Sequence, residues 1–280
     1  AMPGGEIVKI KLIALDLDGT TLGKSGISEK TVSVLETAIK RGVHVVIATG
    51  RTFTSLPKDI YKINGLEYVI SSNGAHITYL PENRVIYSNC ADSTAIEHVG
   101  EILEKNQQYP IEVFTGGRAY IDEAVYRDLK ENGSDYMNVS YIMETRNPVP
   151  GIYDFLRKYK DNIENINIHF RDLGDKAQFW RILEKQQGIT VTSSVTHNIE
   201  IGGATTSKAA AIAWLCSKVN IKEENVMACG DSPNDMAMIK AAGLGVAMAN
   251  AEDQVKDIAD FITLSNEDDG VAYAIRKFVL

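Results

Sequence analysis

The sequence predicts an α/β protein: a parallel sheet covered by helices on both faces, with an α+β domain inserted into it. In the first and last thirds of the chain, short apolar runs alternate with segments of helical period, as in successive strand–helix–strand units. In the middle third, apolar and polar residues alternate over several short segments, which is typical of a sheet with one exposed face. A chain of 280 residues, 44% of them hydrophobic, is long enough to bury two cores.

The N-terminal part begins with a predicted buried strand at residues 10–15, an apolar run that opens into the polar segment Asp-Leu-Asp-Gly-Thr at 16–20. Ser28 is a predicted helix N-cap, and Gly42 is a predicted helix stop. Between them, three apolar residues recur at helical spacing: Val32, Leu35 and Ile39. A strand followed by a helix is therefore expected here.

Two further strands are expected before the insert. Residues 43–48 form an apolar run that ends at Thr49-Gly50-Arg51. Residues 68–70 form a shorter run, followed by Ser-Ser-Asn-Gly at 71–74. Continuous short apolar runs bounded by turn-forming residues indicate strands that are buried on both faces, as in a parallel sheet.

The C-terminal part repeats this alternation. We expect helices at about 207–219 and 233–242 and around Val255 and Ile258, and strands at 225–229, 245–248 and 261–263. In the middle part we expect strands at 139–142, 165–169 and 189–192, and helices at 93–106 and 177–187. The insert is expected to span residues 84–196, and the core to consist of residues 7–83 and 197–280.

Charge and composition argue against several classes of function. The net charge is −8 and no cluster of Lys and Arg stands out, so nucleic-acid binding is not expected. No stretch approaches the roughly 20 apolar residues that span a bilayer, so no membrane association is expected. Residues 1–10 lack the apolar run of a secretory signal, and the three cysteines are odd in number and far apart; both observations favour a cytoplasmic location. The five histidines are scattered, which disfavours a histidine-built zinc site.

Polar side chains follow the carboxyl ends of three predicted parallel strands. They are Asp16 with Asp18, Thr49 with Gly50, and Asp231. Ligands of open α/β sheets bind beyond this edge. Lys208, at the start of a predicted helix, could join these residues. Each of them alone is equally well explained as a cap or turn residue, but their coincidence at one edge indicates a site.

The acidic residues of this edge suggest a cation. Asp16 and Asp18 are separated by one residue in a loop, and two carboxylates so close repel each other unless a cation or a proton neutralises them. Mg²⁺ binds to one or two carboxylates, waters and substrate phosphate. Asp231 adds a third acidic group from another strand end. The residues therefore predict a Mg²⁺ site with free positions for phosphate.

Together these segments resemble the four-motif set of the haloacid dehalogenase (HAD) superfamily. The segments that carry the resemblance, in order, are 16–20, 49–51, Lys208 and Gly-Asp-Ser-Pro-Asn-Asp at 230–235. Ser-Asn-Gly-Ala at 72–75 and Asp-Gly-Val-Ala at 269–272 are similar to the Cof-type sugar-phosphatase branch. The resemblance covers most of the chain outside the insert. It implies a Rossmann-like core with a cap domain.

The resemblance also implies roles for the acidic residues. Asp16 would be the nucleophile that attacks phosphorus and forms an acyl phosphate. Asp18 would protonate the leaving oxygen and then take a proton from the attacking water. Mg²⁺ would be held by an Asp16 carboxylate oxygen, the main-chain carbonyl of Asp18, and Asp231.

The phosphoryl oxygens would be surrounded by hydrogen-bond donors and one cation. By the same resemblance, these are the Leu17 amide, the Thr49 hydroxyl, the Gly50 amide and the Lys208 ammonium group. Asn234 would orient phosphate or metal-bound water. Asp235 would not bind the metal or the phosphate itself but would hold the residues that do.

The place of the insert follows from the spacing of the motifs. Residues 19–48 hold only one loop, one helix and one strand, whereas residues 50–207 hold the whole α+β segment. The insert would close over the strand ends and select the leaving group. Arg51, His169 and Arg171 are candidate substrate contacts, although a solvated surface role explains each of them as well.

We therefore expect a hydrolase that acts on sugar phosphates or similar small phosphomonoesters, with a small-molecule phosphate ester as its partner. One alternative is a phosphomutase, which returns the phosphoryl group to the sugar. A catalytically silent phosphate-binding regulator is another, which the presence of both Asp16 and Asp18 disfavours.

Overall fold

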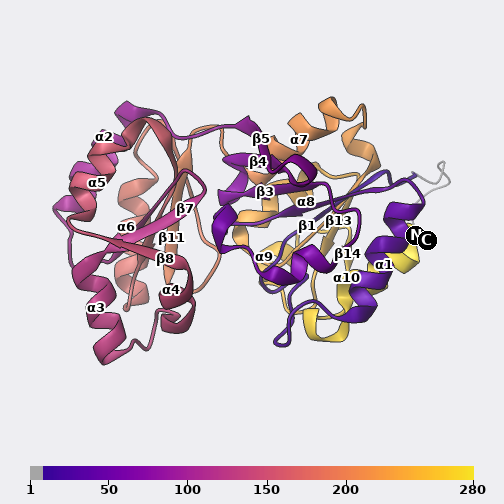
Figure 1. The fold of residues 1–280 in the computed structure, drawn as a ribbon, viewed down its shortest axis with the longest axis horizontal. Coiled ribbons are helices and arrows are strands. Elements are labelled where there is room, and N and C mark those ends of the chain that lie inside the picture. Colours follow the sequence, from indigo (N-terminus) through magenta and orange to yellow (C-terminus); the bar gives the residue numbers. More distant parts are fainter. Residues whose placement is uncertain (1–8) are drawn as a thin grey trace.

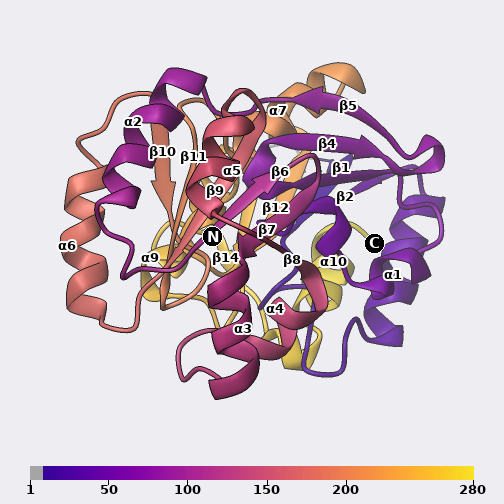
Figure 2. The same cartoon turned by 60° about the vertical axis from the view of Figure 1, so that its left-hand side comes forward.

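The computed structural model describes residues 9–280 and contains two sheets (Figures 1 and 2). The larger sheet has the order β14-β13-β12-β1-β2-β3-β4-β5, and the smaller has the order β10-β11-β9-β6-β7-β8. Residues 1–8 lie outside the described residues. They include most of residues 1–10, where no secretory signal is expected, and residue 7, the expected start of the core. Among residues 9–280, no helix has the length and apolar content needed to cross a membrane.

The larger sheet combines strands from both ends of the chain. Its strands are β1 (Leu12–Leu15), β2 (His44–Ala48), β3 (Tyr68–Ser71), β4 (His76–Tyr79), β5 (Arg84–Ser88), β12 (Val226–Gly230), β13 (Leu244–Ala247) and β14 (Phe261–Ile262). The run from β14 to β3 is parallel, and β4 and β5 extend it as an antiparallel pair. All residues of β1 and β12 are buried, and successive strand residues point to opposite faces. Both faces of the sheet are therefore covered.

The helices around this sheet are α1 (Glu29–Lys40), α7 (Lys208–Lys218), α8 (Met236–Ala241), α9 (Asp253–Lys256) and α10 (Gly270–Phe278). The Ser28 side chain accepts a hydrogen bond from the Thr31 amide and caps α1 as expected. α1 packs against α10, and α7 packs against α8. The strands and helices predicted for this region agree with the structure to within a few residues at most ends.

The smaller sheet has its own hydrophobic core and helices. Its strands are β6 (Ile111–Thr115), β7 (Arg118–Asp122), β8 (Arg146–Val149), β9 (Ile163–His169), β10 (Ile189–Thr192) and β11 (Asn198–Gly203). The helices beside it are α2 (Ser93–Glu104), α3 (Glu123–Asn132), α4 (Val139–Thr145), α5 (Ile152–Lys158) and α6 (Leu173–Leu183). In Figure 1 this sheet and its helices form the left-hand part of the molecule.

The limits of the two sheets differ from the boundaries expected for the insert. β5 at 84–88 pairs with β4 in the larger sheet, although residue 84 was the expected start of the insert. β11 at 198–203 pairs with β9 and β10 in the smaller sheet, although residue 197 was the expected return to the core. The chain therefore passes between the sheets at residues 89–92 and 204–206.

Two secondary-structure predictions in the middle region are corrected. The strand predicted at 139–142 is helix α4, because Asn138 caps the Tyr141 amide and because Val139, Ile142 and Met143, at helical spacing, pack together against α3. The helix predicted at 177–187 is α6 and begins earlier, where Asp172 caps the Asp175 amide.

The expected exposed face of the smaller sheet is also corrected. Every residue of β6, β9 and β11 is buried, so both faces of these central strands are covered. The apolar face packs in the core of this region. The polar face is turned toward the larger sheet, where its side chains line a cavity between the two sheets.

Candidate active site

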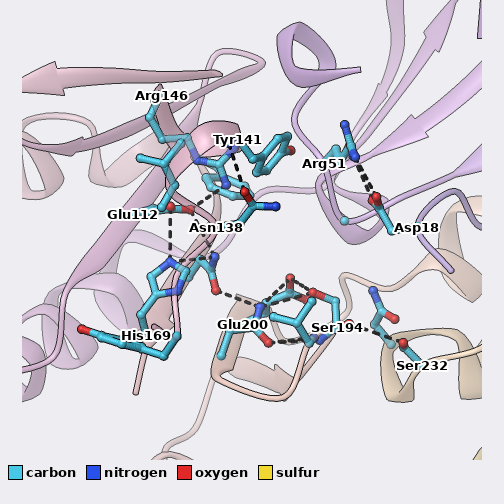
Figure 3. A pocket seen from close by; sticks show the side chains of 18 of the residues that line it. Asp18, Arg51, Glu112, Asn138, Tyr141, Arg146, His169, Ser194, Glu200 and Ser232 are labelled. Carbon is cyan, nitrogen blue, oxygen red and sulfur yellow. Dashed lines mark hydrogen bonds and ion pairs between the residues drawn. The ribbon is translucent and has the colours of Figure 1, made fainter. Parts of the chain in front are cut away.

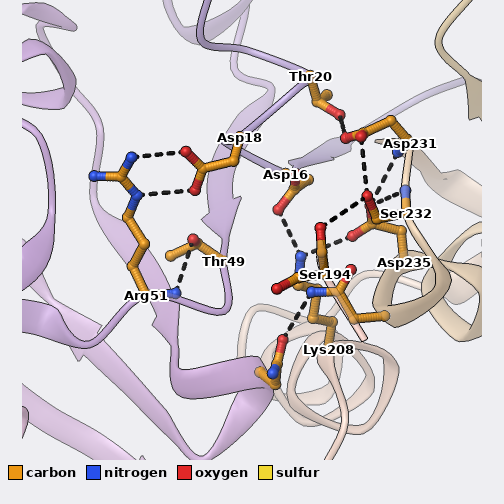
Figure 4. A network of polar contacts seen from close by, with 12 residues as sticks. Asp16, Asp18, Thr20, Thr49, Arg51, Ser194, Lys208, Asp231, Ser232 and Asp235 are labelled. Carbon is orange, nitrogen blue, oxygen red and sulfur yellow. Dashed lines mark hydrogen bonds and ion pairs between the residues drawn. The ribbon is translucent and has the colours of Figure 1, made fainter. Parts of the chain in front are cut away.

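Asp16 and Asp231 lie beside each other because their strands are neighbours. β1 and β12 are parallel, with Leu15 opposite Cys229. The Asp16 amide donates to the Cys229 carbonyl at 3.0 Å and continues this ladder for one more residue. The two acidic residues therefore leave the sheet at the same edge, beyond the carboxyl ends of the strands (Figure 4).

Lys208 joins this edge from the first turn of α7. Its side chain is fully buried, and its Nζ donates to Asp16 Oδ1 at 2.6 Å and to Asp235 Oδ1 at 2.7 Å. Burial alone would lower the pKa of Lys208, but the two carboxylates hold this pKa above its ordinary value. The lysine is therefore a permanent cation between the two acids.

Asp235 also shapes the loop that carries Asp231. Its Oδ2 accepts hydrogen bonds from the amides of Asp231 and Ser232 at 2.9 and 3.1 Å. The Asp231 carboxylate in turn accepts from the Thr20 hydroxyl at 2.7 Å and from the Ser232 hydroxyl at 3.0 Å. A Cβ atom on Gly19, whose φ is +76°, would lie 2.5 Å from Asp231 Oδ2. Only glycine fits there.

The acidic cluster carries more negative charge than Lys208 can balance. Asp16, Asp231 and Asp235 place carboxylate oxygens within 4.8 Å of one another. Burial and the charge of Asp235 raise the pKa of Asp16 well above its ordinary value. The same two causes raise the pKa of Asp231 to about 6. Carboxylate oxygens are the donors that Mg²⁺ prefers. The cluster therefore has both the ligands and the unbalanced charge that suit this ion.

Asp18 points away from this cluster and binds Arg51 (Figure 4). Arg51 Nε donates to Asp18 Oδ2 at 2.8 Å, and Nη2 donates to Oδ1 at 2.6 Å. The Thr49 hydroxyl, which is almost fully buried, accepts from the Arg51 amide at 3.1 Å. The guanidinium also lies 4.7 Å from the centre of the Tyr141 ring, so Arg51 connects the larger sheet to α4 of the smaller one.

A cavity of about 250 Å³ opens between the two sheets at this edge. Four of the residues predicted to form the site line it: Asp16, Asp18, Gly50 and Asn234. Thr49 and Lys208 lie behind this surface, each 1% exposed. Leu17 is fully buried and also lies behind this surface. The predicted site residues thus converge on one region.

The opposite wall of the cavity is the polar face of the smaller sheet (Figure 3). Five buried residues line the cavity on this side, and we call them the polar face: Glu112, Asn167, His169, Asn198 and Glu200. Cross-strand register places Asn167 between Glu112 and Glu200, and His169 opposite Asn198. Of this set, sequence reasoning singled out only His169. The signal for the others was the alternation of polar residues along these strands.

Glu112 is held by a buried cation. Arg146 Nη2 and Asn167 Nδ2 donate to Glu112 Oε2 at 2.8 and 3.1 Å, and His169 Nε2 lies 3.3 Å from Oε1. Burial raises the pKa of Glu112, but Arg146 and His169 outweigh this effect and hold it well below its ordinary value. In Figure 3 the Tyr141 ring lies between Arg146 and Arg51, and the guanidinium of Arg146 lies 4.6 Å from its centre.

The three candidate substrate contacts have different positions. Arg51 and His169 line the cavity. Arg171 does not: its mostly exposed side chain pairs with Asp135 at 3.3 Å and lies over the Tyr136 ring at 5.3 Å. Arg171 is therefore a surface residue in this structure, and its expected contact with substrate is not supported.

Comparison with known proteins gives consistent matches over the whole chain. The sequence profile of the family described as haloacid dehalogenase-like hydrolase matches residues 13–275. Phosphatase YwpJ of Bacillus subtilis (strain 168) is 32% identical over 287 residues, which cover 96% of this chain and 100% of that protein. The 5-amino-6-(5-phospho-D-ribitylamino)uracil phosphatase YcsE of the same organism is 35% identical over 281 residues, 98% of each chain.

Solved structures share the fold. A haloacid dehalogenase-like hydrolase from B. subtilis has a TM-score of 0.81 and 31% identity, covering 97% of this chain and 100% of that one. The HAD subclass IIB sugar phosphatase BT4131 has a TM-score of 0.80 over 96% of this chain and 98% of that one. At 20% identity, this second likeness concerns the fold alone.

Proposed function

The chain belongs to the haloacid dehalogenase-like hydrolase family and is a phosphatase of its Cof-type branch, and we propose that it hydrolyses small phosphomonoesters with Mg²⁺ through an aspartyl phosphate on Asp16. The observation that carries this proposal is the pairing of Asp16 with Lys208 at 2.6 Å beside Asp231 and Asp235. A buried lysine keeps Asp16 oriented and ionisable, as a nucleophilic carboxylate must be.

In the first half of the reaction, an Asp16 carboxylate oxygen forms a bond to phosphorus, and the bond from phosphorus to the ester oxygen breaks. Asp18 donates a proton to that departing oxygen. Both oxygens of Asp18 accept from Arg51 in this structure, so this pair must separate before Asp18 reaches the ester. The Leu17 and Gly50 amides, the Thr49 hydroxyl and Lys208 hold the phosphoryl oxygens.

In the second half, water attacks the phosphorus of the aspartyl phosphate. The new bond joins the water oxygen to phosphorus, the bond from Asp16 to phosphorus breaks, and Asp18 takes the proton of the water. Inorganic phosphate leaves, and Asp16 returns to a free carboxylate. The enclosed position of Asp16, which is 5% exposed, limits the access of other water to the intermediate.

The proposed metal ligands are an Asp16 carboxylate oxygen, the Asp18 carbonyl and Asp231, with Asp235 in support. The fit rests on three clustered carboxylates that share a single lysine. When bound, Mg²⁺ would offset the repulsion between the Asp16 carboxylate and the phosphate dianion.

We further propose that residues 89–203, with the smaller sheet, form the cap domain that selects the leaving group. The polar face presents carboxylate, amide and imidazole groups to the cavity, so it suits a leaving group that offers hydroxyl or N–H donors. A cavity of about 250 Å³ suits a small one. Sugar phosphates fit both conditions. The relative YcsE is named for a ribityl phosphate, which is a polyol phosphate, so polyol phosphates are included among the candidate substrates.

A phosphate-release screen tests the proposal. The purified protein with Mg²⁺ is assayed on hexose, pentose and polyol monophosphates, including 5-amino-6-(5-phospho-D-ribitylamino)uracil, and on an alkyl phosphate without hydroxyl groups. We expect release of inorganic phosphate, faster from the hydroxylated esters. Interconversion of hexose phosphates with almost no release would instead show a phosphomutase, and phosphate binding without either reaction would show a silent regulator.

A further inference from the structure

Three consecutive residues after β3 have left-handed backbone conformations. The φ values of Ser72, Asn73 and Gly74 are 48°, 56° and 101°, and all three residues are buried. Glycine adopts such angles freely and asparagine tolerates them, whereas they are unfavourable for serine. Backbone strain of this kind persists only where surrounding contacts hold it, and it concentrates at functional sites. We call residues 72–74 the left-handed turn.

The left-handed turn is bonded to the loop that carries the proposed phosphate ligands Thr49 and Gly50. The Ser72 amide donates to the Arg51 carbonyl at 2.8 Å, and the Asn73 amide donates to the Thr49 carbonyl at 3.0 Å. These bonds hold the main chain on both sides of Gly50. The positions of the Gly50 amide and the Thr49 hydroxyl therefore depend on the conformation of the turn.

The turn also touches the helix that carries Lys208, another proposed phosphate ligand. A Cβ atom on Gly74 would lie 2.1 Å from the Ser207 carbonyl oxygen and 3.0 Å from the Lys208 amide nitrogen. The main chain of the turn is therefore in direct contact with the start of α7. Groups that bind a ligand must themselves be held in place by the residues behind them. The left-handed turn does this for two separate parts of the proposed phosphate site.

Glu164, in β9 of the smaller sheet, holds Ser72 from across the contact between the two sheets. The Ser72 hydroxyl donates to Glu164 Oε2 at 2.6 Å. Glu164 Oε1 accepts from the Gly117 amide at 2.6 Å and lies 3.6 Å from His76 Nδ1 of the larger sheet. The side chain of Glu164 is fully buried, and each of its oxygens has a partner. Its carboxyl group is thus fixed, and it reaches Ser72 only while the two sheets are in contact.

The next residue of the turn has a similar contact. Asn73 Nδ2 donates to Glu200 Oε2 of β11 at 2.8 Å. Because asparagine tolerates the left-handed conformation better than serine does, the turn depends less on this bond. Ser72 is therefore the residue at which the loss of a partner should disturb the turn most.

We propose that Glu164 is a positioning residue for phosphate binding: by holding the Ser72 hydroxyl, it keeps the left-handed turn in the conformation that places Thr49 and Lys208 around the phosphate. This inference rests on the proposed function. Among residues 9–280, those that line the cavity do not include Glu164, so it acts through Ser72 and not by touching the ester. Docking of the smaller sheet and assembly of the phosphate site are then coupled.

Glu164→Met tests this coupling, because it removes the partner of Ser72 and nearly keeps the length of the side chain. Isothermal titration calorimetry in the presence of Mg²⁺ measures the binding of inorganic phosphate, the product of the proposed reaction. We expect the dissociation constant to rise by about three- to tenfold, the effect of one lost hydrogen bond. A wild-type dissociation constant in E164M would overturn the inference.

The double variant S72G/E164M distinguishes positioning from a general loss of packing. Glycine adopts the left-handed conformation without a partner, so Glu164 has nothing to hold at residue 72 in the S72G protein. We expect E164M to change the dissociation constant of phosphate by no more than about twofold in this background. An equal loss of affinity in the wild-type and S72G backgrounds would show that Glu164 acts by packing alone.

Thr54→Val is the matched control for contact between the two sheets. The Thr54 hydroxyl donates to the Gly117 carbonyl at 3.0 Å, beside the Gly117 amide that Glu164 binds, and among residues 9–280 it has no hydrogen bond to the left-handed turn. This variant should therefore bind phosphate with the wild-type dissociation constant. A loss as large as that of E164M would show that weaker sheet contact is sufficient, and the inference would fail.

A second pair of variants applies if E164M does not fold. Ser72→Ala and Ser72→Gly both lack the hydroxyl, but only glycine is free of backbone strain at this position. We expect weaker phosphate binding in S72A than in S72G, and equal binding in the two would contradict the inference. The proposed function fails separately, if the wild-type protein with Mg²⁺ releases phosphate from none of the esters in the screen.

Discussion

Arg51 binds both carboxylate oxygens of Asp18, at 2.8 and 2.6 Å, and holds this carboxylate away from Asp16. A two-point bond between guanidinium and carboxylate is among the stronger ones in proteins. The side chain of Asp18 nevertheless remains half exposed, so an incoming ester can reach it once the pair with Arg51 separates. The carboxylate that we propose as the acid/base group is thus paired with Arg51 in this structure and lines the cavity where the proposed reaction needs its proton.

Asp18→Asn should affect esters according to their leaving groups. The amide is nearly the same size but cannot donate a carboxylic proton, so release of a sugar alkoxide should slow by about 10²–10⁴-fold. Formation of the phospho-enzyme from p-nitrophenyl phosphate, whose leaving group needs no proton, should slow much less. Single-turnover kinetics on both esters measure the difference. Equal losses on the two esters would contradict the role of general acid.

Lys208→Met should destabilise the metal-free protein. Removal of one partner from a buried ion pair costs about 3–5 kcal/mol, because the carboxylates of Asp16 and Asp235 are left without a cation. The loss should shrink at low pH, because burial and Asp235 raise the pKa of Asp16, so that this carboxylate takes up a proton. Urea denaturation in EDTA near neutral pH and at about pH 5 measures this change. Lys218→Met, on the exposed side of the same helix, is the control and should change stability by no more than about 0.5 kcal/mol.

Removal of the metal should stop turnover. EDTA should abolish phosphate release, and Mg²⁺ should restore it, whereas Ca²⁺ should not, because Ca²⁺ prefers more ligands at longer distances. Phosphate release after dialysis against each ion measures this. Full activity in EDTA would contradict the proposal that the carboxylates of Asp16, Asp231 and Asp235 form a metal site needed for turnover.

The response to Mg²⁺ should also depend on pH. Burial and Asp235 raise the pKa of Asp231 to about 6, above its value in the unfolded chain, so the folded protein binds this proton more tightly. The metal-free protein should therefore lose stability as the pH rises from about 4 to above 6. Because Mg²⁺ needs the ionised carboxylate, proton and metal compete.

Thermal denaturation with and without Mg²⁺ measures this competition. The rise in Tm on addition of Mg²⁺ should be larger at about pH 7.5 than at about pH 5. Asp231→Asn should remove most of the rise at both pH values. An equal rise in Tm at the two pH values in the wild-type protein would show that Asp231 does not exchange a proton for the metal.

The core and the acidic edge of the site are predictable from sequence, because buried parallel strands are short apolar runs that end in polar loops. Asp16, Asp231 and Lys208 illustrate this: each follows or begins an element whose pattern is clear, and the topology brings them together. The segment 139–142 shows the limit. Its alternation suits a strand, whereas its N-cap at Asn138 and the apolar residue at Met143 suit the helix that forms.

The polar face and its contacts with the larger sheet are not predictable in the same way. Asn167 and His169 alternate with isoleucines, and this pattern is the same whether the polar side faces solvent or a second sheet. Only the contact between the two sheets determines whether the polar side faces solvent or the larger sheet. Likewise, Asn73 and Glu200 are 127 residues apart in the chain, and no local pattern relates them.

The most direct test of the central claim is to locate the phosphoryl group on the enzyme during turnover. The reaction is quenched in acid and reduced with borohydride, which converts an acyl phosphate to a primary alcohol, and peptides are analysed by mass spectrometry. We predict reduction at Asp16 in the wild-type protein and none in Asp16→Asn, which should fold normally and release phosphate at least about 10³-fold more slowly. Turnover with no modification at Asp16, or with modification at another residue, would contradict the covalent mechanism.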